Sequence, residues 1–108
     1  MIVIDPPRLD TFRGRRVTTA HMVSTLHGAE GTTELLTFAE SIGMRPEWIQ
    51  HRGEPREHFD LIGRDRCNQA IAAGATVDRT ALGLALIEKR RAATARAIRT
   101  VRTPWSST

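Results

Sequence analysis

The stretch HFDLIGRDRCNQAIAAGATVD, residues 58–78, decides the fold. His58 to Ile62 has the composition of a short strand, and Arg64 to Ala73 has that of a helix which Gly74 closes. Thr76-Val77 then leaves room for a second short strand. A strand, a helix and a strand that follow one another are typical of proteins in which helices pack on a sheet.

The residues before this stretch predict further strands. Met1 to Ile4 is a short run that is apolar on both faces, as in a central strand, and Val17 to Ser24 is β-prone. Trp48 to Gln50 can form another short strand. Residues 8–16 hold four arginines and a glycine, and they predict a mobile basic loop.

Two further helices flank the decisive stretch. Thr32 or Thr33 can cap a helix that Gly43 ends, and Asp78 or Thr80 can cap a helix that runs through Val101. The sequence therefore predicts an α/β fold, a small single-domain layer sandwich with a short mixed sheet, about three helices and a long basic C-terminal helix. We expect an α/β core over residues 1–80, the C-terminal helix over 81–102 and a disordered tail over 103–108.

The last predicted helix has an apolar seam that is interrupted in its middle by Arg91 and Thr94. The seam consists of Leu84, Ile87, Ile98 and Val101. The first half of the helix is therefore expected to pack on the domain. The second half is expected to project, or to pair with a second copy of the chain in a homodimer.

Length and composition exclude several classes of protein. A chain of 108 residues with 40% apolar and 26% charged residues is expected to form one globular domain. Cys67 is the only cysteine, which excludes an intramolecular disulfide and a multi-cysteine zinc site. The start, Met1 to Pro7, has no basic leader, and no segment approaches the roughly 20 apolar residues of a membrane span. We therefore expect a cytoplasmic protein with no membrane partner.

The net charge of +4 is concentrated at the C-terminal end. Residues 1–88 hold all 12 acidic residues and ten of the 16 basic ones, a net charge of −2. The other basic residues follow without an intervening acid: Lys89, Arg90, Arg91, Arg96, Arg99 and Arg102. Such a helix could follow a nucleic-acid backbone or contact a protein partner, although a solvated amphipathic tail has the same pattern.

The residues best suited to chemistry are two histidines and two aspartates. His58 and Asp60 are two positions apart in a predicted strand, so their side chains point to the same face. His21 lies in another predicted strand. Asp5 follows the first strand, at the end where open α/β sheets place ligands. A histidine and a carboxylate together can activate a water molecule or bind a metal ion.

Each of these residues also has an ordinary structural explanation. A histidine can hydrogen-bond a neighbouring acid or a backbone carbonyl, and Asp5 can cap the turn into Pro6-Pro7. Cys67 is expected to be a buried thiol, because it falls within a helical pattern. Trp48 and Phe59 are expected to pack in the core before they stack on a base, because aromatic residues are few.

Six short motifs occur in a recognisable order. They are Ile2-Val3-Ile4-Asp5, Ala20-His21-Met22, Glu34-Leu35 to Phe38-Ala39 with Ile42-Gly43, Trp48-Ile49-Gln50, His58-Phe59-Asp60, and Ala70 to Gly74-Ala75. With them the chain resembles a small bacterial and phage family catalogued as domain of unknown function 4031, over about the first 80 residues. The resemblance implies that Asp5, His21, His58 and Asp60 form one cluster, and it implies no particular reaction.

The chain departs from that family pattern at three positions. Phe59 replaces the tyrosine of a His-Tyr-Asp motif, and Ala20 stands where a small polar residue or a cysteine often precedes the histidine. Leu36 stands where family members commonly carry another histidine. A role that depends on that other histidine is therefore not open to this chain.

The preferred hypothesis is a small cytoplasmic protein with a polar pocket formed by Asp5, His21, His58 and Asp60. If it is an enzyme, the expected reaction is hydrolysis of a phosphate-containing substrate, either a nucleotide or a nucleic acid. The His-Asp pair would activate water, and arginines would neutralise the phosphate, namely Arg15, Arg16, Arg56 and Arg64. A divalent metal held by Asp5, His58 and Asp60 is compatible with this chemistry and not required by it. The alternative is a non-enzymatic binding module that uses the basic helix, in which the histidine cluster only stabilises the fold.

Overall fold

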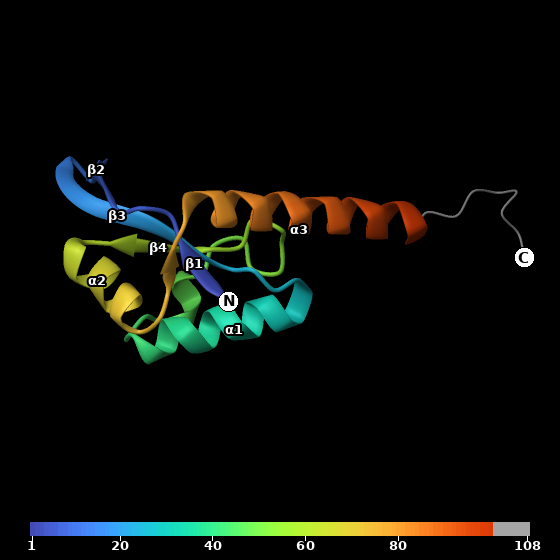
Figure 1. Ribbon diagram of the computed structural model, residues 1–108, viewed down its shortest axis with the longest axis horizontal. Helices are drawn as coiled ribbons and strands as arrows, with labels where there is room; N and C mark the ends of the chain where they lie inside the picture. The colour runs from blue at the N-terminus through green and yellow to red at the C-terminus, as the bar shows by residue number, and fades with distance from the viewer. Residues whose placement is uncertain (101–108) are drawn as a thin grey trace, which may run out of the picture.

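The computed structural model describes residues 1–100 and shows a five-stranded mixed sheet with helices on both faces (Figure 1). The elements in chain order are β1 (Ile2–Ile4), β2 (Arg8–Phe12), β3 (Arg15–Ser24), α1 (Gly28–Ser41), the 3-10 helix η1 (Pro46–Trp48), β4 (Phe59–Ile62), α2 (Arg64–Ala72), β5 (Thr76–Val77) and α3 (Arg79–Thr100). Helices α1 and α2 cover one face of the sheet, and α3 covers part of the other. The predicted α/β layer sandwich is confirmed.

Strand β3 organises the sheet because it pairs with three other strands. It is antiparallel to β1, β2 and β4. Strand β1 also pairs with β5 in parallel, so β1 lies between β3 and β5 and is the central strand that its apolar sequence predicts. The isolated bridge between Gln50 and His58 extends the β4 side.

A β-bulge separates β1 from β2 along the same edge of β3. Ile4 pairs with Met22 and Arg8 pairs with Thr19, so the three residues from Asp5 to Pro7 face only two residues of β3. The Asp5 N–H donates to the carbonyl oxygen of His21 over 3.3 Å. The bulge therefore keeps Asp5 beside His21.

The hairpin formed by β2 and β3 replaces the mobile loop that the sequence predicts over residues 8–16, so that prediction is wrong. Arg13 and Gly14 make its two-residue turn with φ of 51° and 76°, the positive values that a type I′ turn requires. All five side chains of β2 are exposed. The strand therefore lacks the apolar alternation by which a half-buried strand is recognised.

The core lies mainly between the sheet and helices α1 and α2. Met22, Phe59 and Leu61 from the strands are fully buried there against Leu35 and other residues of the two helices. A smaller cluster on the opposite face consists of Val3, Val23 and Leu82. Successive side chains of a strand point to opposite faces of the sheet. The strand residues that alternate with those of the large core therefore point toward the α3 side.

Several predicted element boundaries change in the structure. Helix α1 begins at Gly28 with His27 at its N-cap position, earlier than the predicted caps Thr32 and Thr33. Residues 48–50 do not form a strand, because Trp48 ends η1 and only Gln50 makes a bridge. The predicted roles of Gly43 and Asp78 are confirmed, since Gly43 follows α1 with φ of 79° and the Asp78 carboxylate accepts the N–H of Ala81.

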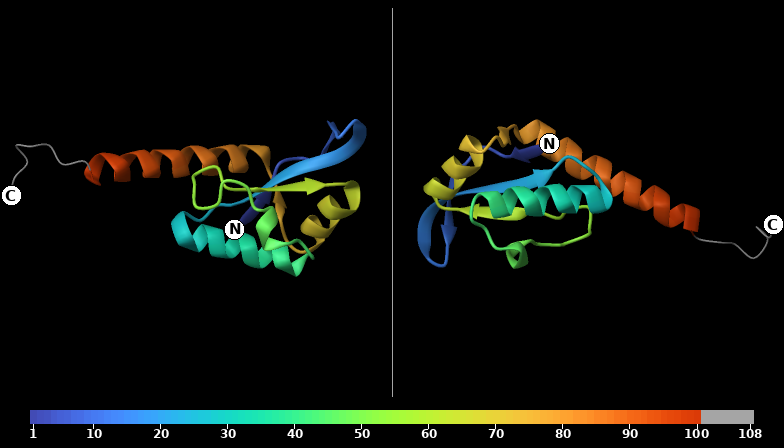
Figure 2. Two further views of the ribbon diagram at one scale, coloured as in Figure 1. Left: turned by 180° about the vertical axis from the view of Figure 1, so that it is seen from behind. Right: turned by 90° about the horizontal axis from the view of Figure 1, so that it is seen from below.

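Helix α3 packs through a different side from the one predicted. Leu82, Ala85 and Lys89 are buried, whereas Leu84 and Ile87 are exposed. The outer half of α3 extends away from the rest of the molecule in every view, as predicted (Figures 1 and 2). Val101 and the predicted tail at 103–108 lie outside the described residues. Among residues 1–100, no helix combines the length and the apolarity that crossing a membrane requires.

Candidate active site

Four polar side chains from three neighbouring parts of the sheet meet on its α3 side. Asp5 follows β1, His21 lies in β3, His58 directly precedes β4, and Asp60 lies in β4. His21 and Asp60 stand opposite each other in the β3–β4 ladder. The structure thus brings together the four residues that the sequence predicts to form one cluster.

Asp5 fixes the orientation of His21. One carboxylate oxygen, Oδ1, accepts the backbone N–H of His21 over 2.6 Å, and Oδ2 lies 2.9 Å from the ring atom Nδ1. A carboxylate accepts hydrogen bonds, so we assign the ring hydrogen to Nδ1. In the neutral ring, Nε2 then carries a free lone pair. The Nε2 atom lies 3.9 Å from Asp60 Oδ1.

His58 is oriented in the same way by a backbone carbonyl. Its Nδ1 lies 2.8 Å from the carbonyl oxygen of Arg56, which can only accept, so Nδ1 is again the donor. Its Nε2 lies 3.3 Å from Asp60 Oδ1. The rings of His21 and His58 are 5.6 Å apart and meet edge to face. Both Nε2 atoms therefore flank one carboxylate oxygen.

Asp60 is held from its other side by Gln50. The Gln50 side-chain amide donates to Asp60 Oδ2, and the backbones of Gln50 and His58 exchange two hydrogen bonds of 2.9 and 3.1 Å. The site is nevertheless open, because the side chain of His21 is 46% exposed and that of Asp60 is 36% exposed. A substrate can therefore reach His21 and Asp60 from solvent, whereas the side chain of His58 is only 19% exposed.

The turn before His58 is anchored by a buried acid. Glu57 is only 3% exposed, and its carboxylate accepts the Thr32 hydroxyl at 2.9 and 2.7 Å and the Gly53 N–H at 2.9 Å. This anchoring fixes residues 53–57 and, through them, the carbonyl group of Arg56 that orients His58. The sequence predicts a polar loop here and does not indicate the burial of Glu57.

A groove of about 500 Å³ adjoins Asp60, and neither His21 nor His58 is among the residues that line it. Its walls include Phe12 and Arg13 from the hairpin, together with Trp48, Gln50 and Arg66. Trp48 is 48% exposed and Phe12 is 43% exposed, so Trp48 is not a core residue, while Phe59 is fully buried as predicted. Sequence reasoning missed the groove because Phe12 and Arg13 approach Asp60 only once the hairpin has formed.

The four arginines predicted to bind phosphate do not gather at the cluster. Arg15 and Arg16 begin β3, about 20 Å along the strand from His21. Arg64 begins α2 and lines a depression with Cys67, on the other side of the sheet. The backbone carbonyl of Arg56 accepts a hydrogen bond from His58 in the site. Arg56 also lines a separate pocket with Leu86 and Arg90 of α3.

The predicted metal ligands are arranged for other contacts. Asp5 bonds to His21 instead of approaching His58. Over residues 1–100, no group of three or more His, Cys, Asp or Glu side chains has the arrangement of a metal site. Cys67 is buried in the core as predicted, and burial raises the pKa of its thiol, with a further contribution from the charge of Asp5.

The basic residues of α3 divide into a buried and an exposed group. Lys89 is only 6% exposed and faces the domain, so it does not belong to an exposed basic surface as the sequence predicts. The side chains of Arg90, Arg91, Arg96 and Arg99 are exposed. Arg102 lies outside the described residues.

A comparison with protein families identifies the relationship that the motifs indicate. The model described as "Protein of unknown function (DUF4031)" matches residues 2–90. The chain belongs to this family. Comparisons of the chain with the curated proteins and with the solved structures found no match. The DUF4031 match contains the whole histidine and aspartate cluster and ends within α3, so the outer half of that helix lies outside the matched region.

Proposed function

We propose that this DUF4031 protein is a hydrolase that cleaves a phosphate ester by acid–base catalysis. The observation that supports the proposal is the convergence of two imidazole Nε2 atoms on one oxygen of Asp60, at 3.3 and 3.9 Å. Each imidazole has its other nitrogen fixed by a hydrogen-bond acceptor. Hydrolysis of an ester requires a base that activates water and an acid that protonates the leaving oxygen, and such a pair supplies both.

The two histidines differ in a way that assigns the roles. His21 is oriented by the Asp5 carboxylate and is the more exposed, so its Nε2 takes the proton from the attacking water. His58 Nε2, which lies 3.3 Å from Asp60 Oδ1, carries the proton that passes to the leaving oxygen as its bond to phosphorus breaks. The water oxygen forms the new bond to phosphorus, and the two products leave as a phosphate and an alcohol.

The groove beside Asp60 favours a nucleotide or nucleic-acid ester among phosphate esters. Its volume of about 500 Å³ lies within the usual range for small-molecule sites. The exposed rings of Trp48 and Phe12 offer surfaces on which a base can stack. Arg13, whose guanidinium lies 5.3 Å from the Phe12 ring, places a positive charge at the same end.

The test is hydrolysis of bis(p-nitrophenyl) phosphate and of a panel of nucleotides by the purified chain and four variants. We expect His58→Ala and Asp60→Asn to lower kcat/KM by about 10²- to 10⁴-fold, the usual contribution of a general acid or base. Glu40→Gln is the matched control, because Glu40 is an exposed acid on α1, far along the chain from the cluster. Trp48→Ala should raise KM for nucleotides more than for the small ester.

Two results would contradict the hydrolase. One is a wild-type rate no higher than that of His58→Ala on every ester tested. The other is equal loss in Asp60→Asn and in Glu40→Gln, which would point to a contaminating enzyme or a general effect on folding.

A second candidate function is nucleic-acid binding by the outer half of α3. The supporting observation is that Arg90, Arg91 and Arg99 are exposed on a helix that extends beyond the domain (Figure 2). Cations on a projecting helix gain free energy by releasing counterions from a phosphate backbone. In this function the histidine cluster serves only to hold β1, β3 and β4 together.

The triple change of Arg90, Arg91 and Arg99 to Gln tests this binding by fluorescence polarisation with labelled oligonucleotides at two salt concentrations. We expect weaker binding and a shallower salt dependence. The control changes Arg45, Arg52 and Arg79 to Gln, because it removes the same charge from exposed positions elsewhere. Equal losses in both triple variants would mean that net charge alone attracts the nucleic acid, and retention of binding by both would place the nucleic-acid contact outside these arginines of α3.

A further inference from the structure

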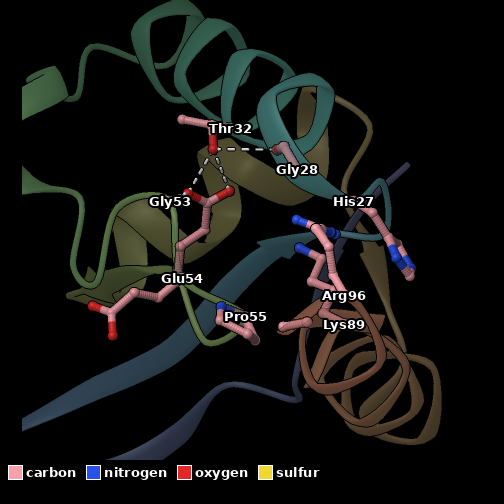
Figure 3. Close-up of a pocket in the computed structure, with 10 residues that line it drawn as sticks. His27, Gly28, Thr32, Gly53, Glu54, Pro55, Lys89 and Arg96 are labelled. Atoms are coloured by element: carbon pink, nitrogen blue, oxygen red, sulfur yellow. Dashed lines mark hydrogen bonds between the residues drawn. The ribbon is translucent and has the colours of Figure 1, made fainter. Parts of the chain in front are cut away.

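A second, smaller cavity lies beside residues 53–57. The beginning of α1, at Gly28 and Thr32, forms one wall, and Lys89, Ala93 and Arg96 of α3 form another. Figure 3 shows Lys89 and Arg96 extending from α3 toward the first turn of α1. The cavity volume is about 50 Å³. A single water needs about 10–15 Å³ by this measure, so the space suits an ion of a few atoms.

Lys89 is the unusual residue of this cavity. Its side chain is buried, with only 6% of its surface exposed, yet among the described residues it makes no hydrogen bond and no ion pair within 4 Å. Every fully buried side-chain nitrogen or oxygen of those residues does have a hydrogen-bond partner. The Lys89 ammonium therefore keeps some accessible surface, and Lys89 lines the cavity. Burial disfavours its charge, which Glu57 and Glu34 attract without an ion pair within 4 Å, and an anion in the cavity would lessen that cost.

The first turn of α1 supplies a second feature that favours an anion. His27 occupies the N-cap position without a side-chain hydrogen bond to the helix, so the first backbone N–H groups lack a capping side chain. These groups carry the positive end of the dipole of a 14-residue helix. Glu54 and Glu57 also border the cavity, and Thr32 and Gly53 already bind the Glu57 carboxylate. Lys89, Arg96 and the helix N–H groups therefore remain for a ligand.

We propose that this cavity binds a phosphate group, held by Lys89, Arg96 and the N-terminus of α1. Its size admits inorganic phosphate or the end of a phosphate monoester whose remainder lies in solvent. The site is independent of the proposed hydrolase, because none of the four residues of the histidine and aspartate cluster lines it. Burial lowers the pKa of Lys89 although Glu57 and Glu34 attract its charge, so a bound dianion would favour the protonated form.

Calorimetric titration with inorganic phosphate tests the site. We expect Arg96→Gln and Lys89→Met each to weaken binding by about tenfold, the loss of one charge-assisted hydrogen bond. Arg90→Gln is the matched control, because Arg90 is an exposed arginine of the same helix that does not line this cavity. His58→Ala should bind phosphate like the wild type, which separates this site from the hydrolase site.

Methyl phosphate then distinguishes the two sources of the phosphate group. Binding at least as tight as that of inorganic phosphate, and lost in Arg96→Gln, identifies a monoester end, whereas exclusion of methyl phosphate identifies the free ion. The proposal is overturned if the wild type binds neither at millimolar concentration, or if Arg96→Gln binds as well as Arg90→Gln. Arg96 is exposed, so its variant decides the matter even if Lys89→Met does not fold.

Discussion

Gly31 lies where the first turn of α1 meets the chain that leads into it. A Cβ atom added there would lie 2.2 Å from the carbonyl oxygen of Leu26. The backbone carbonyl of Leu26 cannot move away as the end of a flexible side chain could. We therefore expect Gly31→Ala to lower the free energy of unfolding by about 2 kcal/mol or more in urea denaturation. Gly83→Ala is the control, because nothing lies within 4 Å of that position on α3. It should raise stability by about 0.5–1 kcal/mol through helix propensity.

A second prediction at the residue scale concerns the only lysine of the chain, Lys89. Its pKa is lowered by burial, so above that lowered value the unfolded chain binds more protons than the folded one. The free energy of unfolding should therefore rise with pH up to the value of an unfolded lysine, near 10.4 on the standard scale. We expect Lys89→Met to lack this rise and to be more stable at neutral pH by about 1 kcal/mol in phosphate-free buffer.

Chemical denaturation of both proteins between neutral pH and pH about 10 measures this difference. The chain has no tyrosine, which removes one other group that titrates in the same range. A Met variant that is less stable than the wild type at every pH would show that the attraction of Glu57 and Glu34 outweighs the burial of the ammonium group.

The candidate site shows how far single residues can be predicted from sequence. That His58 and Asp60 share a face follows from their spacing alone. That Asp5 meets His21 follows from a bulge, and that His21 meets Asp60 follows from the register of β3 on β4. Register depends on pairing between distant segments, and spacing along one segment carries no information about it. The burial of Glu57 and Lys89 also depends on contacts between distant segments, so the local sequence does not indicate it.

At the scale of an element, the β2–β3 hairpin carries a residue poorly suited to its turn. Arg13 has φ of 51°, a conformation that costs a non-glycine residue about 1–2 kcal/mol, whereas Asn tolerates it better. We expect Arg13→Asn, which creates an Asn-Gly turn, to raise the free energy of unfolding by about 0.5–1 kcal/mol. Arg13→Gln is the control, since it removes the charge and keeps the strain. A gain of equal size in both variants would assign the effect to charge.

Elements with strong local signals are the ones that the sequence predicts correctly. Helix α2 and strand β5 lie between Gly63 and Asp78 and were found within a residue or so of their ends. The sequence does not predict β2 or η1, because their side chains are exposed and an exposed element shows no apolar period. On α3 the apolar residues are spread around the helix, so the sequence did not show that Leu82 and Ala85 face the sheet.

At the scale of the whole molecule, truncation tests where the folded unit ends. Lys89 is the last buried residue of α3, beyond the predicted boundary at residue 80. A chain of residues 1–94 should lose little stability and keep the urea m-value of the full chain, because that slope follows the surface exposed on unfolding. A chain of residues 1–80 should unfold or lose several kcal/mol, since it lacks Leu82 and Ala85. Equal stability of the two would place α3 outside the cooperative unit.

The position of β1 also has a consequence for the order in which the chain acquires its structure. Val3 pairs with Thr76 and Ile4 with Val77, although more than 70 residues separate each pair. Closing so long a loop is entropically costly, whereas β1, β2 and β3 are joined by short local connections. The N-terminal strands can therefore assemble early, and β5 with α3 docks last. During synthesis on the ribosome, one edge of β1 stays unpaired until Thr76 and Val77 have emerged.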